Sequence, residues 1–248
     1  MNIKNIILFS SKLGQKKNGV EKSPKYLKKF INKNNKNFHE VNCTKNIYTN
    51  LSNLYTVNKN LNYPKINIGG NHSMSISTVS DSKNKNKNVK ILWFDAHPDI
   101  NNEENSNTKN LHGMPLAYLS NIDYNEKFYY INNKLDLNNL MYIGIRSIDS
   151  FERKIIENKN IKYIDSYNFN NNYNKSLKKI NDFIGKDQVH ISFDVDCIDP
   201  INMHSTGTKS KNGLDVKNLI KVMNFLIKNK KILNINLKEL NFDLSNDK

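Results

Sequence analysis

Short apolar runs recur along the whole chain, and most of them do not alternate with polar residues. The clearest are residues 3–10, 63–70, 89–97, 140–147, 188–196 and 232–240. They are rich in Ile, Val, Leu and Phe, which is typical of strands covered on both faces, as in a parallel sheet. Two weaker runs, at residues 37–42 and 161–166, are further candidates for strands.

Helical patterns fall between these runs. Residues 23–33 begin with Ser and Pro, which favour a helix start, and carry their apolar residues on one side. Residues 176–185 and 216–229 have the same one-sided pattern. Strands that alternate with helices predict an α/β fold with a parallel sheet.

Three asparagine-rich stretches, residues 80–88, 101–110 and 168–176, are expected to be solvated loops. None of them marks a domain boundary, because the alternation of strands and helices continues through each. A chain of 248 residues is also within the range of one α/β unit. We therefore expect a single domain over residues 1–248.

The formal net charge of +15 allows two interpretations. One is a surface for nucleic acid. The other is the bias of an AT-rich genome, because nearly all of the positive charge is lysine, and asparagine and isoleucine are abundant. The lysines are scattered, and no basic stretch is interleaved with aromatic residues that would stack on bases. We favour the second interpretation and expect no nucleic-acid partner.

The chain carries no evident membrane or export signal. No apolar stretch reaches the roughly 20 residues that cross a bilayer, and the first residues lack a signal-peptide cleavage pattern. The two cysteines, Cys43 and Cys197, form no disulfide framework. These features predict a protein of the reducing cytoplasm.

Ionisable residues follow four of the expected strands at the point where each strand ends. They are His72, then Asp95, His97 and Asp99, then Asp194 and Asp196, and finally Glu239. The carboxyl ends of parallel strands meet at one edge of an open α/β sheet, where ligands bind. Residues two apart on a strand point the same way, so we expect each aspartate and histidine series to lie together.

Carboxylates crowded at one edge would repel each other or take up protons, and divalent cations remove that cost. Oxygen-rich sites with a minority of nitrogen suit Mn²⁺ or Fe²⁺ better than structural Zn²⁺. The ligands are too many for one ion and fit two ions about 3.5–4 Å apart, which would share and activate a water molecule. Either short motif alone is explained about as well by chance or by a turn cap as by a metal site. Their joint occurrence at strand ends favours a binuclear site.

The chain resembles the ureohydrolase superfamily in motifs that follow one another in the family's order: GGNHS (69–73), DAHPDIN (95–101), LHGMP (111–115), SFDVDCIDP (192–200), TGT (206–208) and KEL (238–240). The segment KLGQKKNGVEKSP (12–24) resembles the arginase branch in particular. The resemblance implies a three-layer α/β/α fold with a mainly parallel central sheet. It also implies two Mn²⁺ per subunit, hydrolysis of L-arginine to L-ornithine and urea, and a homo-oligomer that is a trimer or a multiple of one.

The same resemblance assigns the metal ligands. One manganese would be held by His72, Asp95, Asp99 and Asp194, and the other by Asp95, His97, Asp194 and Asp196. Asp95 and Asp194 would then bridge the two ions.

The resemblance implies catalytic roles for His112, Glu239 and Asp99. His112 would shuttle protons near the leaving amine, because an imidazole titrates near neutral pH. Glu239 would accept paired hydrogen bonds from the planar guanidinium group.

Four more residues would bind the rest of the substrate. Asn101 and Thr108 would contact its α-carboxylate and Asp149 its α-amino group, and Thr208 matches a threonine of the site rim. Asn101 directly follows the metal motif, as in arginases, whereas agmatine has no carboxylate to bind there. Thr108 keeps the hydroxyl of the serine that is usual at its position.

Three departures from the family pattern leave alternatives open. Asn71 replaces the aspartate usual before the metal-binding histidine, Ser147 replaces another aspartate, and the chain is expected to lack the family's last helix. An agmatinase, a formimidoylglutamase-like enzyme and a catalytically impaired metal-binding relative are therefore alternatives. Against the last, every residue assigned as a metal ligand is present.

Overall fold

The computed structural model describes residues 3–31 and 34–244. An eight-stranded sheet runs through the described part in the order β2-β1-β3-β8-β7-β4-β5-β6, and each neighbouring pair is parallel. The strands are β1 Asn5–Phe9, β2 Asn37–Glu40, β3 Lys65–Gly69, β4 Lys90–Phe94, β5 Leu140–Ile143, β6 Lys162–Ile164, β7 Gln188–Asp194 and β8 Lys231–Lys238. The helices are α1 Ser23–Phe30, α2 Ile47–Lys59, α3 Ser75–Lys85, α4 Pro115–Ser120, α5 Ser150–Asn158, α6 Ser166–Asn171, α7 Tyr173–Ile184 and α8 Val216–Asn229.

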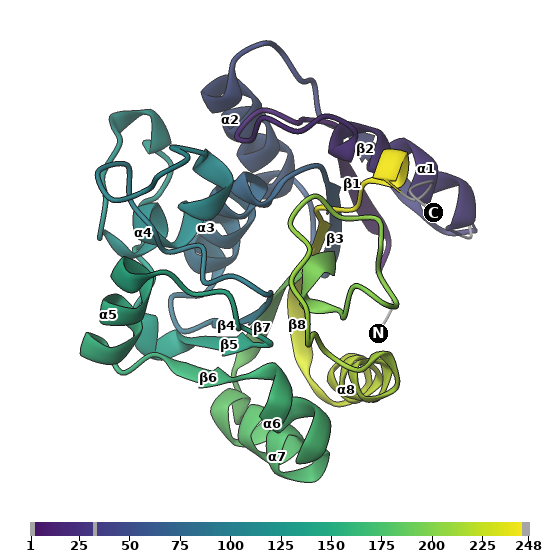
Figure 1. Ribbon diagram of the computed structural model, residues 1–248. Helices are drawn as coiled ribbons and strands as arrows, with labels where there is room; N and C mark the ends of the chain where they lie inside the picture. Colours follow the sequence, from purple (N-terminus) through teal and green to yellow (C-terminus); the bar gives the residue numbers. More distant parts are fainter. Residues whose placement is uncertain (1–2, 32–33, 245–248) are drawn as a thin grey trace.

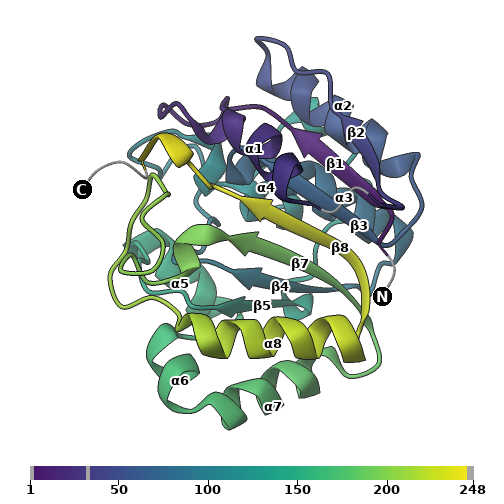
Figure 2. The same cartoon turned by 90° about the vertical axis from the view of Figure 1, so that its right-hand side faces the viewer.

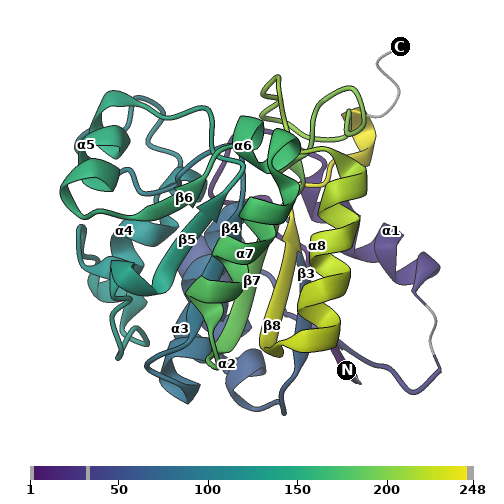
Figure 3. The same cartoon turned by 90° about the horizontal axis from the view of Figure 1, so that it is seen from below.

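Helices cover both faces of the sheet and make three layers. Helices α1, α6, α7 and α8 lie on one face, and α2, α3, α4 and α5 lie on the other (Figures 1 and 3). Buried apolar side chains fill both interfaces, with Ile191 and Val222 on the α8 side and Trp93 and Leu116 on the α4 side. The three-layer α/β/α prediction is thus confirmed.

All eight expected strands are present, but two of the expected loops are wrong. Residues 80–85 are the second half of α3, and residues 168–176 belong to α6 and α7. The sequence pattern does not predict helix α3 because the helix buries polar residues: every residue from Ser75 to Lys83 is buried. Beneath it the sheet offers amides, among them Asn236, which donates to Thr78 Oγ1 at 2.6 Å. A helix that packs by hydrogen bonding has no apolar stripe for a sequence pattern to detect.

All strands point the same way, and the loops that follow them gather at the end of the sheet where the strands have their carboxyl ends. In Figure 2 the arrowheads of β8, β7, β4 and β5 face the same side, where the loops after β4 and β7 lie. None of the helices in the described residues is long and apolar enough to cross a membrane. The edge formed by the carboxyl ends of the strands is where the candidate site lies.

Candidate active site

Turns at the carboxyl ends of three strands carry the candidate metal ligands. They are His72 after β3, Asp95, His97 and Asp99 after β4, and Asp194 and Asp196 at the end of β7. Glu239, the residue predicted to bind the guanidinium group, follows β8 in the same way. The structure therefore brings together the residues that the sequence singled out.

Turn geometry, rather than the expected strand alternation, groups these side chains. Strand β4 ends before Asp95, and β7 ends at Asp194. The backbone N–H of His97 donates to Asp95 Oδ1 at 2.7 Å, and that of Asp196 donates to Asp194 Oδ1 at 3.0 Å. Asp99 has a φ of 51°, a left-handed conformation that is uncommon outside glycine and turns its carboxylate back toward the site.

Two groups of potential ligands share Asp95. One is His72, Asp95 and Asp194, the other is Asp95, His97 and Asp196, and the ligand atoms within each group lie within 4.8 Å of one another. His72 Nδ1 is 2.9 Å from Asp95 Oδ2 and 3.1 Å from Asp194 Oδ2. His97 Nδ1 is 3.1 Å from Asp196 Oδ2. A shared carboxylate between two such groups is the arrangement that a pair of cations requires.

The donor set fits divalent cations. His72 Nδ1 and Asp95 Oδ2 are buried and face each other, yet neither has a hydrogen-bond partner. Asp99 Oδ2 is a further 2.7 Å neighbour of the same nitrogen. Buried polar atoms are nearly always satisfied, and a place for an ion is one of the accepted reasons for an exception. Carboxylates with a minority of imidazole suit Mn²⁺ or a similar ion.

Burial makes the acidic cluster costly without a cation. It raises the pKa of Asp95 to about 7, with Asp196 adding to the effect. It also raises the pKa values of Asp99 and Asp194, and it lowers the pKa of His72. Without metal the cluster therefore holds protons near neutral pH, and divalent cations would displace them.

Asp196 is the exception among the four aspartates. Burial opposes its ionisation, but hydrogen bonds from His97 and Thr208 hold its pKa at about 2. The hydroxyl of Thr208 donates to Asp196 Oδ2 at 2.8 Å. Thr208 lines the pocket as a rim residue would, and in this structure its hydroxyl orients a candidate ligand.

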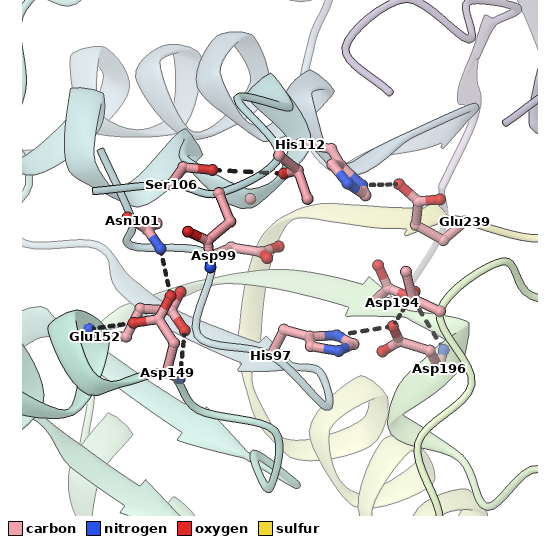
Figure 4. A pocket seen from close by; sticks show the side chains of 14 residues that line it. His97, Asp99, Asn101, Ser106, His112, Asp149, Glu152, Asp194, Asp196 and Glu239 are labelled. Atoms are coloured by element: carbon pink, nitrogen blue, oxygen red, sulfur yellow. Dashed lines mark hydrogen bonds and ion pairs between the residues drawn. The ribbon is translucent and has the colours of Figure 1, made fainter. Parts of the chain in front are cut away.

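Glu239 and His112 lie side by side in the wall of the pocket (Figure 4). His112 Nδ1 lies 3.3 Å from Glu239 Oε1, which also accepts from the backbone N–H of His72 at 2.8 Å. Glu239 Oε2 accepts from Gln15 Nε2 at 2.8 Å. Glu239 is 2 % exposed and has a φ of 60°, so the backbone is held in a strained form that aims this carboxylate at the pocket.

The predicted substrate residues lie on the other side of the same pocket. Asn101, Thr108 and Asp149 all line it, and Asn101 Nδ2 donates to Asp149 Oδ2. Asp149 also caps α5 by accepting from the backbone N–H of Glu152 at 2.8 Å. The first turn of α5 thus holds the side chain of Asp149 in place, and Asp149 in turn orients the side chain of Asn101.

Sequence reasoning missed Gln15 and Glu152. Gln15 lies within the arginase-like segment 12–24, which was the available signal, but nothing in its type points to a carboxylate 224 positions away. Glu152 lines the pocket and is 7 % exposed. Its place three residues after Asp149 is the spacing of a capping box, which the structure contains.

Asn71 has a donor role that an aspartate would lack. Its Nδ2 donates to the carbonyl oxygens of Leu13, at 2.6 Å, and Ser11, at 3.4 Å. Its Oδ1 accepts from the backbone N–H and the hydroxyl of Ser73. The amide therefore ties the loop that carries Gln15 to the turn that carries His72.

We predict that Glu152→Gln removes part of the pH dependence of stability in the metal-free protein. Burial raises the pKa of Glu152 from 4.5 to about 7, so the folded protein binds a proton between these values that the unfolded chain releases. Stability then falls as pH rises through this window, by roughly 3 kcal/mol at about 1.4 kcal/mol per unit. Urea unfolding in chelator at pH 5 and pH 8 measures the change.

The wild-type protein should lose more stability between the two pH values than Glu152→Gln. Glu157→Gln, an exposed change on the same helix, should follow the wild type. An equal loss in all three proteins would contradict the assignment.

An eight-stranded parallel sheet with helices on both faces, and a pocket of carboxylates and imidazoles at its carboxyl edge, defines an α/β/α hydrolase of the ureohydrolase type. The arginase family's sequence profile matches residues 9–248. The chain belongs to the arginase family.

Individual relatives agree with this assignment. The Entamoeba histolytica arginase is 33% identical over 95% of this chain and 89% of its own length. The Plasmodium falciparum arginase is 31% identical over 92% of this chain, which spans only 56% of that longer protein. The crystal structure of the Entamoeba histolytica arginase in complex with L-ornithine superimposes with a TM-score of 0.91 at 29% identity, over 100% of this chain and 95% of that one.

Proposed function

We propose that this protein is a manganese-dependent arginase that hydrolyses L-arginine to L-ornithine and urea. The observation that carries the proposal is the pair of ligand groups joined at Asp95. His97, Asp194 and Asp196 of these groups line the same pocket as Glu239 and Asn101. The relatives of similar length bear the name arginase, which supports the same substrate.

His72, Asp95, Asp99 and Asp194 would hold one manganese ion, and Asp95, His97, Asp194 and Asp196 the other. When bound, the two ions supply an activated water for attack on the guanidinium carbon. The short contacts from His72 Nδ1 to three of these carboxylates support the first ligand set.

Glu239 would orient the guanidinium group. Its carboxylate is buried, and the strained backbone directs it into the pocket. The two carboxylate oxygens can accept paired hydrogen bonds from the planar guanidinium group. His112, within 3.3 Å of it, would hold the proton that the leaving amine takes up. Asp99 lies beside His72 and would take part in catalysis as a ligand of the same manganese ion.

Asn101 and Thr108 would bind the α-carboxylate, and Asp149 the α-amino group. The hydrogen bond from Asn101 to Asp149 supports this division, because it couples the two recognition points. Agmatine carries no carboxylate, so these residues favour L-arginine over agmatine. A formimidoylglutamase-like activity finds no separate support in the pocket.

We predict that Asn101→Ala lowers kcat/KM for L-arginine roughly tenfold to 100-fold and leaves that for agmatine unchanged. A hydrogen bond to a charged group is worth about 1.5–3 kcal/mol, and each factor of ten corresponds to about 1.4 kcal/mol. The measurement is urea release from both substrates by the manganese-loaded variant.

Asn105→Ala is the matched control, since Asn105 is an exposed residue of the same loop outside the pocket. It should leave both rates unchanged. A proportional fall for both substrates in Asn101→Ala would mean that Asn101 does not read the carboxylate.

The cytoplasmic setting and the homo-oligomer, as a trimer or a multiple of one, are part of this proposal. Both rest on the family resemblance and on the composition of the chain. Sedimentation of the purified protein measures the second.

A further inference from the structure

Lys238 is a buried lysine immediately behind the candidate metal site. It is the last residue of β8 and is fully buried. Its register partner on the adjacent strand β7 is Asp194. Its Nζ donates to Ser75 Oγ at 2.5 Å and to Ser192 Oγ, and lies 4.6 Å from the centre of the Trp93 ring. Neutral hydroxyls and an aromatic face thus satisfy its donors.

Several lysines within residues 3–31 and 34–244 form a direct ion pair with an aspartate or a glutamate, but Lys238 forms none there. Lys65, which is also fully buried, contrasts with it. Lys65 Nζ lies 2.5 Å from Asp81 Oδ2, at the opposite end of the sheet. A buried charge normally needs such a partner, because taking it out of water is costly unless an opposite charge compensates. Lys238 therefore calls for a different source of compensation.

The carboxylates of the metal site are that source. Burial lowers the pKa of Lys238 to about 7, while Asp194, Asp95, Asp99 and Glu239 act in the opposite direction. Lys238 is also paired with Asp194 in the sheet, and both residues are buried, so its positive charge acts on the cluster that the cations would occupy. Lys238 also touches the ligands indirectly, since Ser192 Oγ lies 3.2 Å from His72 Nε2 and the Trp93 ring stacks on His72 at 4.3 Å.

We propose that Lys238 is an internal cation of the site, which balances carboxylate charge when metal is absent and weakens the binding of Mn²⁺. Its positive charge attracts the carboxylates and repels the incoming ions, so it narrows the gap in free energy between the metal-free and loaded states. The site then releases manganese more readily, and its occupancy depends more strongly on the concentration of free Mn²⁺. This inference rests on the metal site of the proposed function.

Two roles for Lys238 predict opposite results. If its charge dominates, removing the charge tightens Mn²⁺ binding. If it acts mainly by orienting Ser192, and through it His72, its removal loosens the site. Outer partners of metal ligands change affinity by roughly 10-fold to 100-fold, so either effect is measurable.

The test is calorimetric titration of Mn²⁺ into metal-free wild type, Lys238→Met and Lys238→Gln at pH 6, where a pKa of about 7 leaves Lys238 mostly charged, with melting temperatures before and after loading. Methionine removes the charge and the donors, whereas glutamine keeps an N–H donor and removes only the charge. We expect both variants to bind Mn²⁺ about tenfold more tightly or better, and to gain more melting temperature on loading than the wild type.

Lys65→Met is the matched control, since it removes a buried lysine far from the ligands. It should lose stability in both states and keep the wild-type affinity for Mn²⁺. Unchanged or weaker binding in Lys238→Gln would overturn the proposal. A wild-type protein that binds no Mn²⁺ would instead refute the proposed function, so the two failures are distinguishable.

Discussion

Asp95→Asn should lose high-affinity manganese and release urea from L-arginine at less than about one hundredth of the wild-type rate. Changing an outer partner of a metal ligand already costs roughly 10–100-fold, and Asp95 belongs to both ligand groups. Asparagine keeps an oxygen for the N–H of His97, which now donates to Asp95 Oδ1 at 2.7 Å, so the turn should persist. What is lost is the second oxygen and the charge.

The measurement is metal content after gel filtration, together with urea release by the same sample. Asp199→Asn is the matched control, because Asp199 also lies in the connection after a central strand, β7, but accepts from the backbone N–H groups of Ile201 and Gly213 outside the site. That variant should keep its metal and activity. Two firmly bound ions in Asp95→Asn would show that this carboxylate does not bridge.

Glu239→Gln should have the second-largest effect, and it should act on the substrate rather than on the metals. Truncating one partner of a buried charge pair costs about 2–5 kcal/mol, which is about 30-fold to more than 1,000-fold in kcat/KM. Glutamine retains an oxygen for the backbone N–H of His72, so the local fold should hold. The amide at Gln15 can turn over to meet the new donor.

Metal content separates the two variants. Glu239→Gln should bind as much manganese as the wild type while its activity falls, whereas Asp95→Asn should lose both. Wild-type activity in a folded, metal-loaded Glu239→Gln protein would remove Glu239 from substrate recognition.

The sheet was predictable because its strands bury apolar runs on both faces, and the candidate ligands were predictable because they follow those runs. Helix α3 was hidden because its residues, such as Ser77 and Thr78, are polar and nevertheless buried. The pairing of Asp95 with His97 was expected for the wrong reason: β4 ends one residue earlier, and a backbone hydrogen bond in the turn makes the contact.

Other features depend on contacts between distant segments, which spacing along the chain does not reveal. Gln15 reaches Glu239 from a loop that hydrogen bonds from Asn71 and from the backbone of His112 hold against the site. Lys238 occupies an alternating strand position that faces the helix layer, where a buried charge is the least expected residue. Its surroundings of hydroxyls and an indole come from β4, β7 and α3.

The decisive measurement of the proposed arginase activity is urea release from L-arginine by the manganese-loaded wild-type protein, with agmatine in parallel and metal content determined on the same sample. We predict two manganese ions per chain, urea from L-arginine, and a much slower but measurable release from agmatine. A folded protein with both ions bound that released no urea from L-arginine would show that it is not an arginase.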